Sequence, residues 1–159
     1  MLFETIHDLK AGEDRIRSRR YGVIKVVDGR LDSIRLRPLP KLATPECVLL
    51  GQRYHARRQG NVCLVYYNQP LRFPNFLALK YANSSQDCTI ATILTAQKVL
   101  EEVARIKRTD AMLCDAANLR ISDRLLARWG WESHTSSRWH RNYIKRFYGN
   151  YPPPLSLQG

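Results

Sequence analysis

Residues 118–149 read NLRISDRLLARWGWESHTSSRWHRNYIKRFYG and are the most informative part of the chain. Ser122 and Asp123 favour a helix start, because serine caps free amides and aspartate meets the positive end of the helix dipole. We expect a short helix over 122–129, a Trp-Gly-Trp corner over 129–131 and a strand over 143–148. No other part of the chain combines such specific signals.

Upstream of this stretch lie two β-rich runs separated by a long helix. FLALKY (76–81) and AMLC (111–114) are typical of short strands. Between them, apolar residues recur at helical spacing from Ile90 through Leu94 and Leu100 to Ala104. A helix of this length suits a right-handed crossover, so we expect the two strands to be parallel.

The N-terminal half adds antiparallel structure. Asp28-Gly29 separates YGVIKVV from RLDSIRLRPL and favours the type I′ turn of a β-hairpin. In the second run Ile34 and Leu36 alternate with arginines, which predicts one buried and one basic face. VCLVYY (62–67) reads as another strand, and Thr44-Pro45-Glu46 predicts a helix to about Arg58, with a strand as the alternative. The order of elements predicts an α/β (α+β) protein with a central twisted sheet flanked by helices.

The 159 residues fit one domain. We expect a basic arm over 1–20, the domain over 21–150 and a proline-rich tail over 151–159. The first fifteen residues lack the apolar core of a secretory signal, and no apolar run approaches a bilayer span, so the expected location is the cytoplasm, without membrane contact. Cys47, Cys63, Cys88 and Cys114 are widely spaced, which predicts small buried hydrophobes and no metal site.

Residues 76–148 resemble the GNAT acyltransferase superfamily, in which a short helix ends in a pattern like L-Y-x-K-x-G-F. The matching run here extends from Leu125 to Trp131, with Asn118 upstream at nearly the family spacing. The resemblance implies that Gly130 ends the helix in a left-handed conformation and that Trp131 places its ring in the core. It also implies an acyl-CoA-dependent N-acyltransferase, with acetyl-CoA or another acyl-CoA as donor and an amine as acceptor.

The resemblance further implies where the cofactor binds. Backbone amides of the loop over 83–89 would meet the pyrophosphate and Asn118 would lie beside the pantetheine arm, giving the site residues Ser84, Ser85, Gln86, Cys88, Thr89 and Asn118.

Two departures favour a relative that kept the fold but lost the usual chemistry. The loop reads NSSQDCT, without the family's glycines and with a negative Asp87. The family's proton-donating tyrosine falls at Leu126, which cannot donate. Other groups that could serve as acid or base near the expected cleft are Asp115, Glu132, His134, Tyr143 and Tyr148.

The net charge of +12 supports an alternative, a non-enzymatic module that binds RNA or DNA. Cations neutralise phosphates while aromatic rings stack on bases, and the residues that would do so are Arg15, Arg17, Arg19, Arg20, Arg141, Lys145 and Arg146. The same strand can instead pack its rings inward beside extended cations. The sequence leaves the oligomeric state open.

Overall fold

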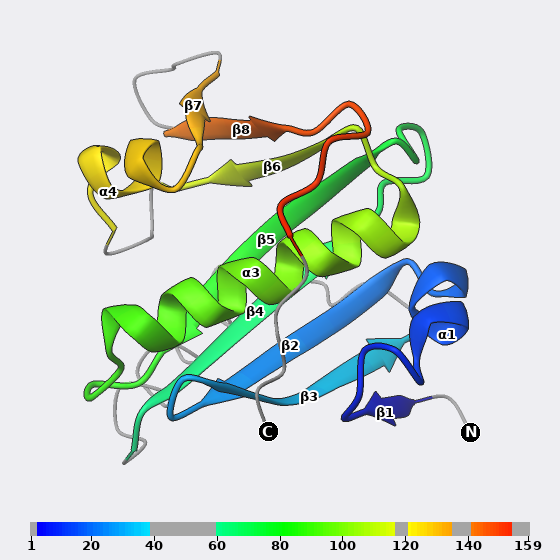
Figure 1. Ribbon diagram of the computed structural model, residues 1–159, viewed down its shortest axis with the longest axis horizontal. Coiled ribbons are helices and arrows are strands. Elements are labelled where there is room, and N and C mark those ends of the chain that lie inside the picture. Colours follow the sequence, from blue (N-terminus) through cyan, green and yellow to red (C-terminus); the bar gives the residue numbers. More distant parts are fainter. Residues whose placement is uncertain (1–2, 39–59, 117–120, 135–140, 154–159) are drawn as a thin grey trace.

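The computed structural model describes residues 3–38, 60–116, 121–134 and 141–153. These residues form one sheet of eight strands in the order β1-β3-β2-β4-β5-β6-β8-β7 (Figure 1). The strands are β1 (Glu4–Ile6), β2 (Tyr21–Val27), β3 (Arg30–Arg37), β4 (Val62–Asn68), β5 (Phe76–Ser84), β6 (Ala111–Asp115), β7 (Glu132–Ser133) and β8 (Asn142–Arg146). The helices are α1 (Glu13–Ser18), α3 (Ile90–Lys107) and α4 (Asp123–Arg128). The expected α/β class, with a central sheet and packed helices, is confirmed.

The predicted hairpin is present as β2 and β3. Asp28 and Gly29 both have positive φ, 50° and 75°, as a type I′ turn requires, and Val27 pairs with Arg30 across it. Ile34 and Leu36 are buried while Arg35 is exposed, so the predicted two-faced strand is confirmed. The strand β2 also pairs antiparallel with β4, and β4 pairs antiparallel with β5.

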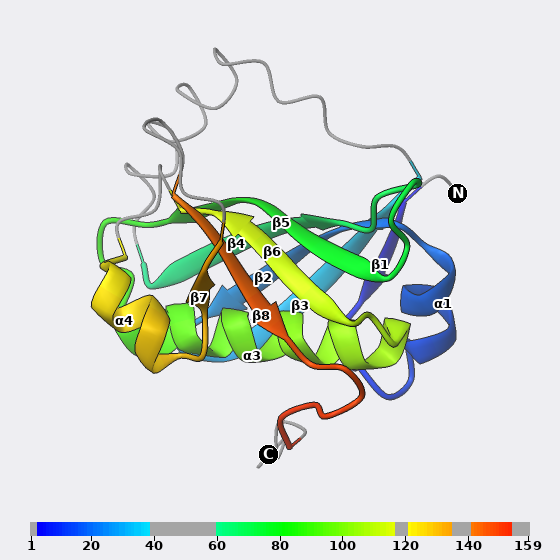
Figure 2. The same cartoon turned by 90° about the horizontal axis from the view of Figure 1, so that it is seen from above.

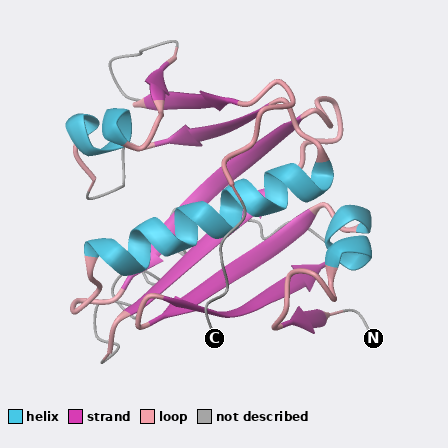
Figure 3. Cartoon of the chain, viewed as in Figure 1, coloured by secondary structure: helices cyan, strands magenta, loops and turns pink. Residues whose placement is uncertain are grey.

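The predicted crossover is also present. Helix α3 connects β5 to β6, and these two strands pair in parallel from Phe76↔Ala111 to Leu79↔Cys114. Strand β8 then pairs antiparallel with β6, and the two-residue β7 pairs with β8 at the edge. The described helices α1, α3 and α4 lie on one face of the sheet (Figures 2 and 3).

Helix α3 supplies much of the core. Thr89 caps it by accepting a hydrogen bond from the Thr92 amide, and Arg108 ends it in a left-handed conformation. The buried face runs through Ala96, Val99 and Val103. Ile90, which the apolar spacing assigns to this face, is the first residue of α3 and is 61% exposed.

Residues 4–18 differ from the free basic arm expected at the N-terminus. They form β1 and α1, and Ile6, Leu9 and Ile16 are buried in the common core. A helix of six residues needs only one apolar anchor, here Ile16, so it shows no apolar stripe in the sequence. The helix predicted from Thr44 to Arg58 and part of the tail lie outside the described residues.

Candidate functional site

The parallel strands β5 and β6 separate at one end. Beyond the pair Leu79↔Cys114, β5 continues to Ser84 with β4 as its partner, whereas β6 ends at Asp115. A bulge on β5 opposite Tyr66 and Tyr67 accompanies the separation. Such a split leaves a cleft that neighbouring helices must cover.

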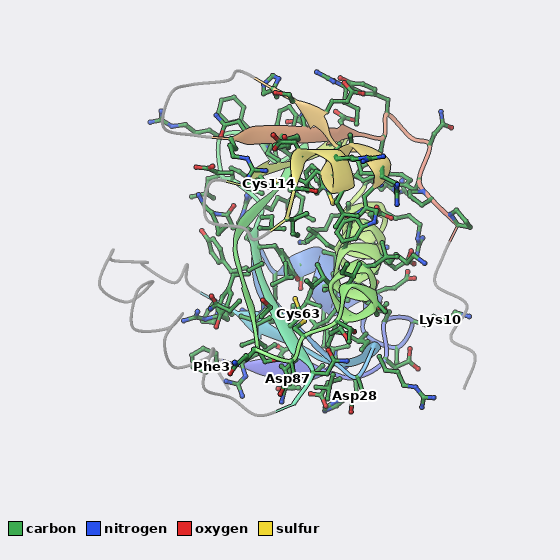
Figure 4. The ribbon with its side chains drawn as sticks, turned by 90° about the vertical axis from the view of Figure 1, so that its left-hand side faces the viewer. Phe3, Lys10, Asp28, Cys63, Asp87 and Cys114 are labelled. Carbon is green, nitrogen blue, oxygen red and sulfur yellow. The ribbon has the colours of Figure 1, made fainter. Side chains whose placement is uncertain are left out.

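An apolar cavity lies in this split, beneath α3 and α4. The strands contribute Cys63, Val65, Leu79, Ala82 and Cys114. The helices and the corner that follows α4 contribute Ile93, Gln97, Leu100, Ile121, Leu126, Trp129 and Trp131. In Figure 4 the labelled Cys114 lies above the labelled Cys63, and both are on the sheet beside α3.

The cavity measures about 40 Å³. A cavity of roughly 150 Å³ binds benzene, and one water needs roughly 10–15 Å³. The space therefore suits a group of very few non-hydrogen atoms, and its lining favours an apolar one.

The Trp-Gly-Trp corner is fixed to α3 by a side-chain amide. The Trp131 indole N–H donates to Gln97 Oε1 at 2.9 Å, and Gln97 Nε2 donates to Glu101 Oε1 at 2.9 Å and to the Trp129 carbonyl at 3.3 Å. Trp131 is 4% exposed, which confirms that its ring lies in the core. Because the oxygen and the nitrogen of the Gln97 side chain are hydrogen-bonded to these partners, the cavity wall remains apolar at this residue.

A buried ion pair completes the corner. Lys145 Nζ, on β8, donates to Glu101 Oε1 and, at 2.8 Å, to the Trp129 carbonyl. Gly130 has a φ of +88°, as predicted, and a Cβ there would lie 3.1 Å from Lys145 Cε. Glycine thus provides both the left-handed turn and the space for the lysine.

The loop expected to bind pyrophosphate is held by the protein's own hydrogen bonds. The Ser85 amide donates to the Val62 carbonyl, the Cys88 amide to the Ser85 carbonyl, and the Thr89 amide to Asn61 Oδ1, at 2.9, 3.2 and 2.8 Å. Ser84 and Gln86 are exposed, and among the described residues the Gln86 amide has no acceptor. Asn118 lies outside the described residues. A full phosphate cradle over 84–89 therefore does not fit the structure.

Tyr143 and Asp115 are the predicted acid–base candidates beside the cavity. Tyr143 pairs across strands with Cys114, and its hydroxyl donates to Asp123 Oδ1 at the start of α4. This hydrogen bond raises the pKa of the tyrosine, so it stays protonated at neutral pH. Asp115 accepts a hydrogen bond from the Arg141 amide at 3.3 Å.

No motif in the sequence predicts that the Tyr143 hydroxyl bonds to Asp123. Asp123 also accepts from the Arg141 guanidinium, and the hydrogen bonds from Tyr143 and Arg141 lower the pKa of its carboxyl group. Asp123 looks like a helix-start residue in the sequence, and its second role depends on β8 lying beside α4.

The other candidates lie away from the cavity. Glu132 pairs with Arg146 at the edge of the sheet, and His134 is exposed beside it, with its amide donating to the Asn142 carbonyl. Tyr148 is 67% exposed at the far end of β8. Burial raises the pKa of Cys114 to about 12, so this cavity thiol stays protonated.

Most of the cations assigned to nucleic-acid contact have acidic partners in the protein. Arg17 pairs with Asp14, Arg19 with Glu4, Arg141 with Asp123, Lys145 with Glu101 and Arg146 with Glu132. Arg20 is half-buried, and its Nη1 lacks a described partner. Arg15 alone of the seven is exposed without an ion pair among the described residues.

The site is thus an apolar cavity at the split of a parallel strand pair, in a mixed α/β protein. The described helices include none with the length and apolar character that crossing a membrane requires. Comparison with protein-family models, curated proteins and solved structures finds no match.

Proposed function

We propose that the protein binds the thioester end of an acyl-CoA in the cleft between β5 and β6, as a GNAT-like N-acyltransferase or as a relative that binds without transferring. The observation that carries the proposal is the apolar cavity at the point where the two parallel strands separate. Open sheets bind ligands near the carboxyl ends of their strands, and this cavity includes Cys114, the residue before the last of β6.

The size of the cavity favours a short acyl group. About 40 Å³ has room for the methyl end of an acetyl or propionyl group but not for a long chain. The apolar walls would exclude water from the thioester. The phosphates of the donor would contact the exposed Gln86 amide and the first turn of α3, in place of the full cradle that the family resemblance implies.

Binding is expected to raise the melting temperature. At roughly 100 times the dissociation constant, acetyl-CoA should stabilise the fold by about 2.7 kcal/mol, or about 5–10 °C for a chain of this size. Palmitoyl-CoA below its micellar concentration should give a smaller shift. A thermal-shift series with acetyl-CoA, palmitoyl-CoA, CoA and a short oligonucleotide measures this.

A variant that fills the cavity tests whether acetyl-CoA raises the melting temperature by binding there. Ala82→Leu places its larger side chain in the cavity and should abolish the acetyl-CoA shift, whereas Ala127→Leu adds the same volume on the exposed side of α4 and should keep it. No shift in the wild type at saturation contradicts the proposal. A shift with the oligonucleotide alone supports the nucleic-acid module instead.

If the protein transfers the acyl group to an amine, the departing thiolate needs a proton donor. We propose that the Tyr143 hydroxyl, which donates to Asp123 in the free protein, turns to protonate the departing thiolate, and that the tyrosinate then takes the proton that the amine loses on acylation. Tyr143→Phe should lower the rate of thiol release with primary amines by about 100-fold while leaving the acetyl-CoA affinity unchanged. Tyr148→Phe, at the exposed far end of the strand, should change neither. Unchanged turnover in Tyr143→Phe rejects this role.

A further inference from the structure

Cys63 and Cys88 lie on two segments that the protein's hydrogen bonds hold together, the start of β4 and the loop that follows β5. Cys63 is on β4, is 2% exposed and lines the cavity. Cys88 is half-buried in the loop that leads into α3. The amide of the next residue, Thr89, donates to Asn61 Oδ1, two residues before Cys63, at 2.8 Å. In Figure 4 the labelled Asp87 marks this loop below the labelled Cys63.

The backbone on both sides of the thiols is held in place. Cys63 pairs with Ser84 in the β4–β5 ladder. Ser85 Oγ donates to the Gly60 carbonyl at 2.5 Å and accepts from the Val62 amide at 2.9 Å. The side chain of Asn61 accepts from the Thr89 amide at 2.8 Å. The segments on either side of each cysteine are thereby tied together, which lowers the entropy cost of joining the sulfurs.

We propose that Cys63 and Cys88 form a peroxide-sensitive dithiol site that closes to a disulfide. The proposal is independent of acyl binding, because it concerns only the two thiols and the oxidant. Its product would link β4 to the loop that precedes α3, beside one wall of the cavity.

The two cysteines have different roles because their surroundings differ. The hydrogen bond from Cys63 lowers the pKa of Cys88, which is also the more exposed of the two. The same contact, together with burial, raises the pKa of Cys63. Cys88 is therefore the thiol that reacts first, and Cys63 is the thiol that resolves the product.

The reaction proceeds in two balanced steps. The Cys88 thiolate attacks one peroxide oxygen, so that an S–O bond forms, the O–O bond breaks and the departing hydroxide takes a proton to become water. The Cys63 sulfur then attacks the Cys88 sulfur, so that the S–S bond forms, the S–O bond breaks and a second water leaves with the Cys63 proton. Two thiols are oxidised by two electrons, and the peroxide is reduced to two waters.

Peptide mapping tests the proposal on the full chain. The reduced protein is treated with an equimolar amount of hydrogen peroxide, the remaining thiols are alkylated, and the chain is digested without reductant. The expected product is one pair of peptides joined through Cys63 and Cys88, lighter than their sum by two hydrogen atoms and separated by dithiothreitol. Cys114, which is buried on β6 and has a raised pKa, should be recovered reduced.

Single-cysteine variants test which thiols form the disulfide. Cys88→Ala should leave Cys63 reduced, while Cys114→Ala should leave the link intact. Recovery of Cys88 as a sulfinic acid beside a free Cys63, a link from Cys88 to another cysteine, or two reduced thiols after the peroxide is consumed would overturn the proposal. The wild-type map requires no variant to fold, and it contains no acyl-CoA, so its failure is separate from that of the proposed function.

Discussion

Replacing Trp131 with alanine is expected to lower the free energy of unfolding by about 4 kcal/mol. The ring is 4% exposed, lines the cavity and donates its N–H to Gln97. Its removal deletes a large buried side chain and also leaves the Gln97 oxygen without its partner. Urea denaturation of the variant and the wild type measures the loss.

A second substitution separates packing from hydrogen bonding at this position. Trp131→Phe keeps an aromatic ring but removes the N–H, so its cost should be about 2 kcal/mol, half that of the alanine variant. An alanine variant that loses under 1 kcal/mol would contradict the role of the corner as part of the core.

Removing the charge of Lys145 is expected to cost about 3–5 kcal/mol, because Glu101 then remains buried without its cation. The side chains of Lys145 and Glu101 are only 15% and 8% exposed. Lys145→Met keeps the length of the side chain, so the loss reports the charge and its hydrogen bonds. Combining it with Glu101→Gln should restore part of the stability, since no charge is left uncompensated.

The neighbouring residue on β8 provides a matched control. Arg146 pairs with Glu132, whose side chain is 64% exposed, so Arg146→Met should cost less than about 1 kcal/mol. Two results would contradict a buried Lys145–Glu101 ion pair. The first is a similar loss of unfolding free energy in Lys145→Met and Arg146→Met. The second is a Lys145→Met/Glu101→Gln double variant that is no more stable than Lys145→Met.

The sequence predicts the sheet well where local rules decide. Asp28-Gly29 specifies its turn by its own backbone preference, and Ser122 caps α4 through the Leu125 amide, as its place before the helix indicates. The crossover from β5 to β6 follows from the length of the helix between them. Each of these signals lies within a few residues of the element that it predicts.

The same rules miss features that depend on distant residues. Composition sets residues 1–20 apart as a basic arm, yet β1 pairs with β3 some 30 residues away, Glu4 with Leu36. Lys145 resembles a nucleic-acid contact in the sequence, but Glu101 lies opposite it on α3. The thiol pair and the Tyr143–Asp123 hydrogen bond are likewise products of tertiary packing.

The site residues are predictable only in part. The resemblance leads to the loop over 83–89. Asn61, which accepts a hydrogen bond from the Thr89 amide, lies just before β4 and belongs to no motif in the sequence. The cavity is likewise assembled from β4, β5, β6, α3 and α4, and no local spacing connects these elements.

We propose that the cavity at the split of β5 and β6 receives the acyl group. The direct test is nuclear Overhauser spectroscopy of the methyl-labelled protein with a non-hydrolysable thioether analogue of acetyl-CoA. We predict contacts between the acyl methyl group and the methyl groups of Leu79, Ile93 and Leu126, which line the cavity from three elements. The absence of contacts to these three residues at a saturating concentration of the analogue would show that the acyl group does not bind in this cavity.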